Sequence, residues 1–226
     1  MAGRLPSPDV TEDARGDGHP AAVRVGIVLL TGPSGSGKSV LAARSGLPTV
    51  GLDDFYRDGD EDDLPRDPAG RIDWDDVGSW DADAALAALQ ALATTGRTQL
   101  PIYDIASDRA VGTRHLDVGD APLVIAEGIF AAELIGPCRA RGLLADALCL
   151  ANGRNRTFRR RLARDLRESR KAPLTLVRRG WQLRRSEPEL IAGLRARGAR
   201  IVDAETALAR LRTLGAPVVG RRDAAA

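Results

Sequence analysis

The chain has 226 residues, 43% of them hydrophobic and 28% charged, and its 33 basic and 31 acidic residues give a net charge of +2. This length fits one domain with a sizeable core, and the near-neutral balance excludes a generally basic nucleic-acid-binding protein. No apolar run approaches the roughly 18 residues of a membrane span. Residues 1–22 lack the apolar core of a signal peptide and are expected to form a disordered tail. We therefore expect a cytoplasmic protein in which Cys138 and Cys149 are reduced thiols.

Strand-like and helix-like segments alternate along the rest of the chain. The expected strands are VRVGIVLL (23–30), LPTVGL (47–52), APLVIAEG (121–128), LLADALCLA (143–151) and ARIVD (199–203). The expected helices cover 38–45, 81–96, much of the Arg-rich stretch 153–194, and 205–214. This alternation predicts one α/β domain over 23–217, with a parallel sheet flanked by helices. Residues 218–226 are expected to be a second tail.

The segment GPSGSGKS (32–39) fits the pattern GxxxxGK[ST], and it stands between an expected strand and an expected helix, as a phosphate-binding loop requires. Glycines let backbone N–H groups turn toward phosphate oxygens without a clash. Lys38, one of only two lysines in the chain, would hold the outer phosphates, and the Ser39 hydroxyl would bind Mg²⁺. A flexible Gly/Ser turn is the alternative, which the context disfavours. The predicted ATP-binding residues are Gly32, Ser34, Gly35, Ser36, Gly37, Lys38 and Ser39.

The segment LDDFY (52–56) comes directly after the second expected strand. Because parallel strands present ligands at their carboxyl ends, Asp53 is expected near the phosphate loop. A carboxylate there can accept the proton of an attacking hydroxyl or hold a metal ion. A solvated acidic turn is the alternative.

These motifs, with IDWDD (72–76), PIYDIASDR (101–109), VIAEGIF (124–130) and RTFRRRLARD (156–165), resemble the uridine kinase-like family of P-loop kinases over roughly residues 24–171. The resemblance implies the P-loop NTPase fold, ATP as co-substrate, Mg²⁺, and an Arg-rich helical lid over about 153–171. It implies catalytic roles for Asp53, Lys38 and Arg164, and metal binding by Ser39 and Glu127. It implies that Asp53, Tyr56, Asp73, Tyr103 and Arg161 bind the substrate and that Lys171 is a further lid cation.

Each of these roles has a plainer alternative. Most arginines of the lid segment would form a solvated face, Asp73 would belong to a solvated acidic loop, and Glu127 would cap the following helix. The two tyrosines would simply pack, and Trp74, Trp80 and Trp181 are interpreted as packing residues.

The resulting hypothesis is a kinase that phosphorylates the 5′-hydroxyl of uridine or cytidine. Ser107 stands where the family has a base-contacting histidine, which leaves other hydroxyl acceptors open: pantothenate, a sugar phosphate or nicotinamide riboside. A nucleotide-binding regulatory or nucleic-acid-associated module is the alternative of another class. The near-neutral net charge, together with Asp53 and Glu127, disfavours that module. A homo-oligomer is left open.

Overall fold

The structure, a computed structural model, describes residues 22–151 and 188–216. The predicted lid at 153–171, with Arg161, Arg164 and Lys171, lies outside the described residues, as do Trp181, the tail 218–226 and all but the last residue of the tail 1–22. Across the described part of the chain, no helix is long and apolar enough to cross a membrane.

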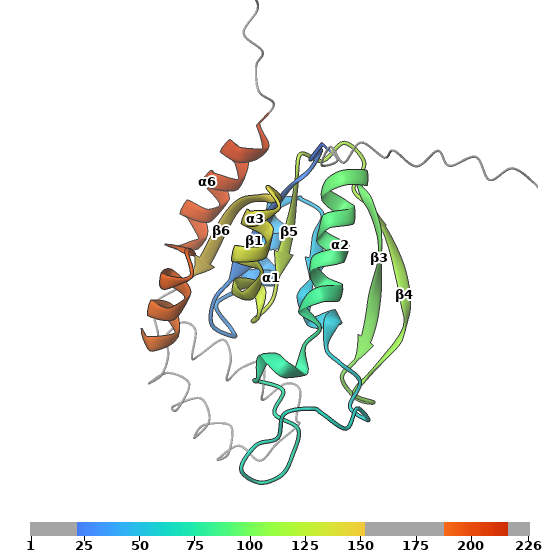
Figure 1. Cartoon of the computed structure of the whole chain (residues 1–226). Helices are drawn as coiled ribbons and strands as arrows, with labels where there is room; N and C mark the ends of the chain where they lie inside the picture. The colour runs from blue at the N-terminus through green and yellow to red at the C-terminus, as the bar shows by residue number, and fades with distance from the viewer. Residues whose placement is uncertain (1–21, 152–187, 217–226) are drawn as a thin grey trace, which may run out of the picture.

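The centre of the molecule is a five-stranded parallel sheet in the order β2-β5-β1-β6-β7 (Figure 1). Its central strand, β1, is almost wholly buried, as expected for a strand covered on both faces. The predicted parallel α/β architecture is therefore confirmed. The strands are β1 (Gly26–Thr31), β2 (Thr49–Gly51), β5 (Leu123–Glu127), β6 (Leu144–Leu150) and β7 (Arg200–Val202).

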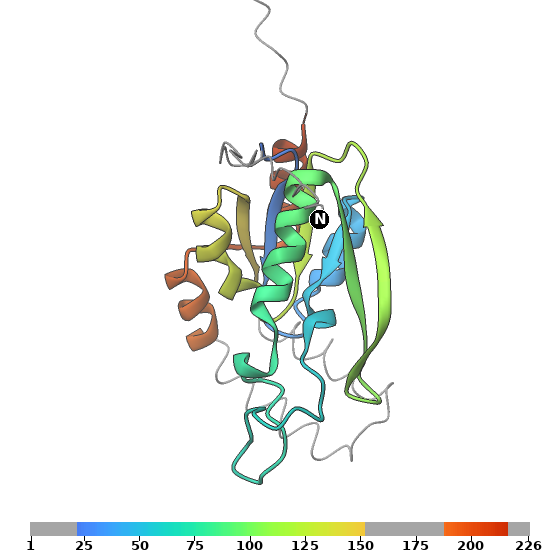
Figure 2. The ribbon, with the colours of Figure 1, turned by 45° about the vertical axis from the view of Figure 1, so that its right-hand side comes forward.

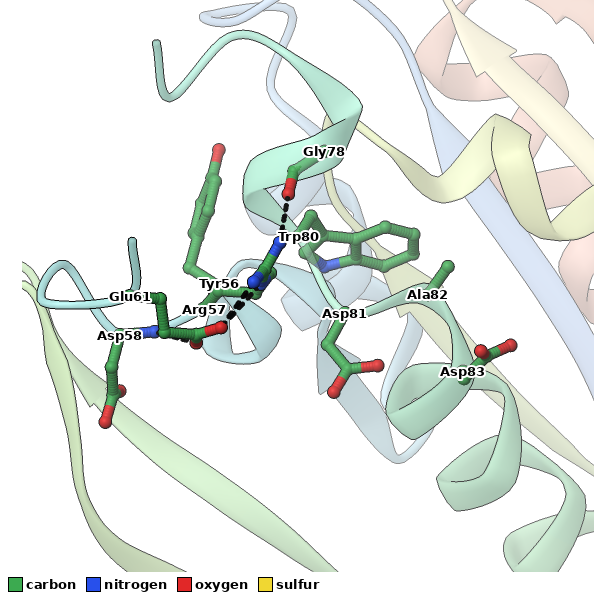
Figure 3. A pocket seen from close by; sticks show the side chains of 9 residues that line it. All are labelled: Tyr56, Arg57, Asp58, Glu61, Gly78, Trp80, Asp81, Ala82 and Asp83. Carbon is green, nitrogen blue, oxygen red and sulfur yellow. Dashed lines mark hydrogen bonds and ion pairs between the residues drawn. The ribbon is translucent and has the colours of Figure 1, made fainter. Parts of the chain in front are cut away.

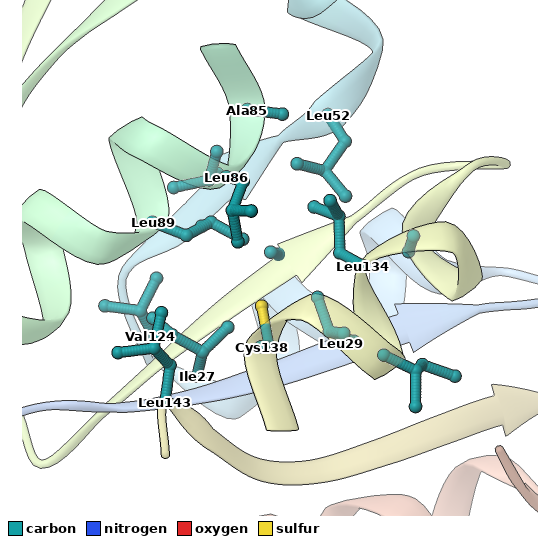
Figure 4. Packing of buried hydrophobic residues seen from close by; sticks show 14 of the residues in the cluster. Ile27, Leu29, Leu52, Ala85, Leu86, Leu89, Val124, Leu134, Cys138 and Leu143 are labelled. Carbon is teal, nitrogen blue, oxygen red and sulfur yellow. The ribbon is translucent and has the colours of Figure 1, made fainter. Parts of the chain in front are cut away.

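Successive apolar side chains of β1 point to opposite faces of the sheet, and helices cover both faces. On one face, Ile27 and Leu29 pack with α2 (Ala82–Thr95), the turn η3 (Ala131–Leu134) and α3 (Ile135–Ala140), as Figure 4 shows. On the other face, Val28 and Leu30 pack with α1 (Lys38–Ser45) and α6 (Ala204–Gly215). A further helix runs over residues 188–196 before β7. This rigid core fixes the strand ends from which the candidate site is built.

A separate antiparallel hairpin, β3 (Arg97–Asp104) and β4 (Arg109–Asp117), lies beside α2 (Figure 2). The hairpin was not among the expected elements. Most residues of β4 are exposed, so the strand lacks the alternation of buried and exposed residues that marks a half-buried strand. The packing of β3 against α2 and the turn η1 (Leu52–Phe55) brings the hairpin to the ends of the parallel strands.

Candidate active site

The phosphate loop connects β1 to α1, and its glycines occupy positions that other residues fill poorly. Gly32 has φ 135°, and a Cβ there would lie 2.7 Å from the carbonyl oxygen of Leu150 on β6. Gly37, with φ 97°, is the N-cap of α1. Both values are in the region that favours glycine. The loop can therefore pass close to β6 and end in the exposed N–H groups of a helix N-terminus.

Lys38 opens α1 and folds back over the loop. Its Nζ donates a 3.0 Å hydrogen bond to the carbonyl oxygen of Gly32, and only 8% of the residue is exposed. Ser36 is fully buried, and its N–H donates to the carbonyl of Pro33 at 3.0 Å. The loop is thus held in a compact turn with the ammonium group across it, which is a suitable arrangement for phosphate oxygens.

Ser39 and Glu127 meet although 88 positions separate them. Glu127 ends β5, and β1 and β5 are neighbours with Leu30 opposite Glu127. The Ser39 Oγ donates a 2.7 Å hydrogen bond to Oε1 of Glu127. A hydroxyl and a carboxylate are oxygen ligands of the kind that Mg²⁺ takes together with phosphate and water. The residues that the structure describes contain no group of three or more His, Cys, Asp or Glu that could hold a metal ion.

Asp53 stands in η1, directly after β2, whose last residue Gly51 pairs with Glu127. A Cβ at Gly128 would lie 3.0 Å from Asp53 Oδ1, so glycine leaves room for the carboxylate against the end of β5. Asp53 is exposed to solvent by its surface area, but the protein atoms around the carboxylate remove part of its hydration. This desolvation, followed by the negative charge of Glu127, raises the pKa of Asp53, while the charge of Lys38 lowers it. A carboxylate with a raised pKa is a better proton acceptor.

The adjacent Asp54 has a different partner. Its Oδ2 lies 3.6 Å from the guanidinium of Arg114 on β4. Neighbouring carboxylates in one short turn would be expected to compete for the same cation. In the structure they have different neighbours: Asp53 lies against Gly128 at the end of β5, and Asp54 lies beside Arg114 of the hairpin.

Aromatic side chains gather beside η1. The ring of Tyr56 lies 5.6 Å from Trp74, 5.9 Å from Tyr103 and 6.0 Å from Phe130. The Tyr56 hydroxyl donates to the carbonyl of Trp74 at 3.0 Å, and that of Tyr103 donates to the carbonyl of Arg57 at 3.1 Å. Burial raises the pKa of Tyr56 above its ordinary range and that of Tyr103 to about 12, so both phenols stay neutral.

The two predicted substrate tyrosines are thus brought together, and Trp74 packs edge-on against both of them, as expected for a packing residue. Asp73 is half-buried, and its Oδ1 accepts the N–H of Asp75 at 3.1 Å, which shapes this turn. Trp80 is a packing residue as expected, since it is 4% exposed and its Nε1 donates to the Leu52 carbonyl at 2.8 Å.

A pocket of about 570 Å³ lies between residues 56–61 and the start of α2 (Figure 3). Four carboxylates line it, from Asp58, Glu61, Asp81 and Asp83, and no residue of the phosphate loop does. The guanidinium of Arg57 is held by Glu61 at 2.9 Å and by the carbonyl of Gly78 at 3.2 Å. The pocket is therefore acidic, and its arginine, Arg57, already pairs with Glu61.

Comparison with known proteins gives relatives for part of the chain. No family model matches it. The chain is 31% identical over 161 residues to the inorganic pyrophosphatase TTM2 of Arabidopsis thaliana, across 67% of this chain and 22% of that protein. It is 29% identical over 112 residues to the uridine kinase of Saccharomyces cerevisiae, across 46% of this chain and 22% of that protein. The chain thus spans 22% of the length of the curated relatives it matches.

The likeness to solved structures covers up to 80% of this chain. A protein assigned as a fructose transport system kinase, from Silicibacter sp. TM1040, matches with a TM-score of 0.51 and 23% identity, over 80% of this chain and 88% of that one. A protein assigned as a uridine kinase, from Bacillus stearothermophilus, matches with a TM-score of 0.43 and 20% identity, over 67% of this chain and 85% of that one. This chain therefore shares the fold of the Silicibacter protein, a P-loop NTPase fold with a parallel sheet flanked by helices.

Proposed function

We propose that the chain is an ATP-dependent kinase that phosphorylates a hydroxyl group of a small molecule, with the 5′-hydroxyl of uridine or cytidine as the first candidate. One observation carries this proposal: Lys38, the Ser39–Glu127 pair and Asp53 all lie at the carboxyl ends of β1, β5 and β2. Phosphoryl transfer needs groups that bind the phosphates, ligands for a metal ion, a cation near the transferred group and a proton acceptor. The phosphate loop, Ser39 with Glu127, Lys38 and Asp53 would fill these roles in that order.

In the proposed reaction, residues 32–39 cradle the phosphates of ATP, and Lys38 neutralises charge on the outer ones. Ser39 and Glu127 would hold Mg²⁺, which supplies electrostatic stabilisation of the transferred group. The acceptor oxygen forms a bond to the γ-phosphorus while the bond to the bridging oxygen breaks and ADP leaves. Asp53 orients the acceptor hydroxyl and takes its proton, and its raised pKa supports this role. Arg161 and Arg164, outside the described residues, remain proposed as lid cations.

The aromatic side chains beside η1 support a ring-bearing acceptor. Tyr56, Trp74 and Tyr103 form a half-buried aromatic cluster, and side chains of this kind can stack on a base.

A second candidate follows from the sequence relative whose name is inorganic pyrophosphatase. The same cradle and metal pair could direct water, in place of an acceptor hydroxyl, at a phosphoanhydride bond. The two reactions differ in their products, and this difference can be measured directly.

The test is to incubate the protein with Mg²⁺ and ATP and one acceptor at a time: uridine, cytidine, nicotinamide riboside, pantothenate, fructose or fructose 6-phosphate. Pyrophosphate alone is a parallel reaction, and chelation of Mg²⁺ is the control. Mass spectrometry measures the phosphorylated acceptor, and a phosphate assay measures hydrolysis. Phosphorylated uridine or cytidine in stoichiometry with ADP is the expected result. Phosphate release from pyrophosphate, with no phosphorylated acceptor, would replace the kinase by the second candidate.

A further inference from the structure

The turn η1 presents two successive carboxylates, Asp53 and Asp54, near a proposed metal site. Carboxylates this close repel each other, and both attract the same cations. If both faced the phosphate loop, Asp54 would compete with Glu127 for the metal and with Asp53 for the acceptor hydroxyl. Something must therefore keep the roles of the two residues apart.

Arg114 lies where it can do this. It stands on β4 directly opposite Leu100 of β3, and opposed residues of an antiparallel pair share one face of the hairpin. Leu100 is fully buried in the core, so this face is the inner one. Arg114 accordingly is half-buried, at the inner edge of the hairpin, and its guanidinium lies 3.6 Å from Asp54 Oδ2.

Hydrogen bonds hold the hairpin to the segment that follows η1, so the guanidinium of Arg114 is presented from a fixed position. The Tyr103 hydroxyl donates to the carbonyl of Arg57 at 3.1 Å. The N–H of Ala110 donates to Asp58 Oδ1 at 2.8 Å, and the N–H of Gly59 donates to the carbonyl of Asp108 at 2.7 Å. Residues on both strands and at the hairpin tip therefore hold the hairpin against 57–59.

We propose, on the basis of the proposed kinase function, that Arg114 is a positioning residue that holds Asp54 to the hairpin, so that Asp53 alone serves the phosphoryl transfer. Arg114 does not touch the reacting atoms in this proposal. It acts through Asp54, by compensating its charge and fixing its direction. The effect of losing Arg114 must then depend on the presence of the Asp54 carboxylate.

The test is a double-mutant cycle with Arg114→Leu and Asp54→Asn, with the acceptor that the wild-type protein phosphorylates. Arg114→Leu should lower kcat by roughly 3- to 30-fold, a value within the range of coupling between residues in contact, with the KM for ATP within about twofold of wild type. Asp54→Asn should have a small effect, and the double variant should recover to the level of Asp54→Asn. Arg114→Lys keeps the charge and should retain most of the activity.

Arg109→Leu is the matched control, because Arg109 belongs to the same hairpin but pairs with Asp60, at 3.1 Å, outside η1. It should leave kcat nearly unchanged. The inference is overturned if Arg114→Leu turns over like wild type, if the double variant stays as slow as Arg114→Leu, or if Arg109→Leu is equally slow. Thermal melting checks that each variant folds, and Arg114→Gln replaces Arg114→Leu if the latter does not. A wild-type protein that phosphorylates no acceptor would instead overturn the proposed function itself, and this inference with it.

Discussion

The hydroxyl of Ser39 and the carboxylate of Glu127 are joined by a 2.7 Å hydrogen bond, which ties the first turn of α1 to the end of β5. Ser39 and Glu127 come together because β1 and β5 are neighbouring parallel strands, with Glu127 opposite Leu30 near the end of β1. The bond places two oxygen ligands next to the phosphate loop. The proposed metal site follows from this sheet register.

Replacing Glu127 by Gln should weaken the metal site while keeping its shape. The amide can still accept the Ser39 hydrogen bond, but it lacks the charge that attracts Mg²⁺. We expect the Mg²⁺ concentration for half-maximal turnover to rise by roughly tenfold or more. Glu205→Gln is the control, because that side chain is 79% exposed and pairs with Arg44 in the last turn of α1, away from Ser39 in its first turn. An unchanged Mg²⁺ titration for Glu127→Gln would argue against Glu127 as a ligand.

Lys38→Ala should abolish ATP binding and transfer but leave the fold intact. The lost hydrogen bond to the Gly32 carbonyl should cost about 1 kcal/mol, which a domain of this size tolerates. Arg44→Ala is the control, as Arg44 lies on the same helix with its side chain 52% exposed. Calorimetric titration with Mg²⁺ and ATP, alongside thermal melting, gives both readouts. Wild-type affinity in Lys38→Ala would mean that the loop binds nucleotide by another arrangement.

Asp53→Asn should stabilise the protein at neutral pH in the absence of ligands. Desolvation and the charge of Glu127 raise the pKa of Asp53 in the folded state, so ionising it there costs folding free energy that the unfolded chain does not lose. The gain in melting temperature should be largest at about pH 7. It should shrink as the pH falls through the raised pKa and vanish below about pH 4, where both states are protonated.

Asp54→Asn is the control for this stability measurement. It removes a carboxylate from the same turn but also breaks the ion pair with Arg114, so it should not raise the melting temperature. Melting curves from about pH 3 to pH 8, recorded with a chelator present, separate the two variants. A gain for Asp53→Asn that stayed constant over this range would rule out titration of Asp53 as its cause.

Gly128→Ala should displace the turn that carries Asp53. A Cβ at this position would lie 2.8 Å from Cβ of the fully buried Leu52 and 3.0 Å from Asp53 Oδ1. Because misplacement by about 1 Å can cost roughly 10²-fold, we expect kcat to fall by up to that factor while the KM for ATP changes little. Gly136→Ala on α3 is the control, since nothing lies within 4 Å of the added carbon. Equal kcat values for both variants would show that η1 has room to adjust.

Local signals in the sequence were sufficient for most of the sheet and its helices. The helix expected at 81–96 is observed at Ala82–Thr95, because Asp81 accepts the N–H of Ala84 at 2.8 Å and Gly96 ends it with φ 76°. The buried strands were recognisable as short apolar runs, and β5 and β6 differ from the expected ranges only at their ends. These features depend on residues close in the chain, which a sequence displays directly.

The hairpin and the strand order depend on contacts between distant residues. β4 is mostly exposed, and its extended shape comes from pairing with β3. For the same reason, the position of Asp53 beside a strand end could be anticipated from LDDFY, whereas the partner of Asp54 could not. Arg114 comes 60 positions after Asp54 and belongs to no recognisable motif. The separation of the two carboxylates is visible only in the folded chain.

The central claim is that Asp53, and not its neighbour, accepts the proton in phosphoryl transfer. The most direct measurement is single-turnover transfer from ATP to the acceptor identified in the panel, with wild type, Asp53→Asn and Asp54→Asn at saturating ATP and Mg²⁺. Asp53→Asn should slow the transfer by roughly 10²–10⁴-fold with nearly unchanged ATP affinity, and Asp54→Asn should cost much less. Transfer by Asp53→Asn at the wild-type rate, or a larger loss in Asp54→Asn, would contradict the account.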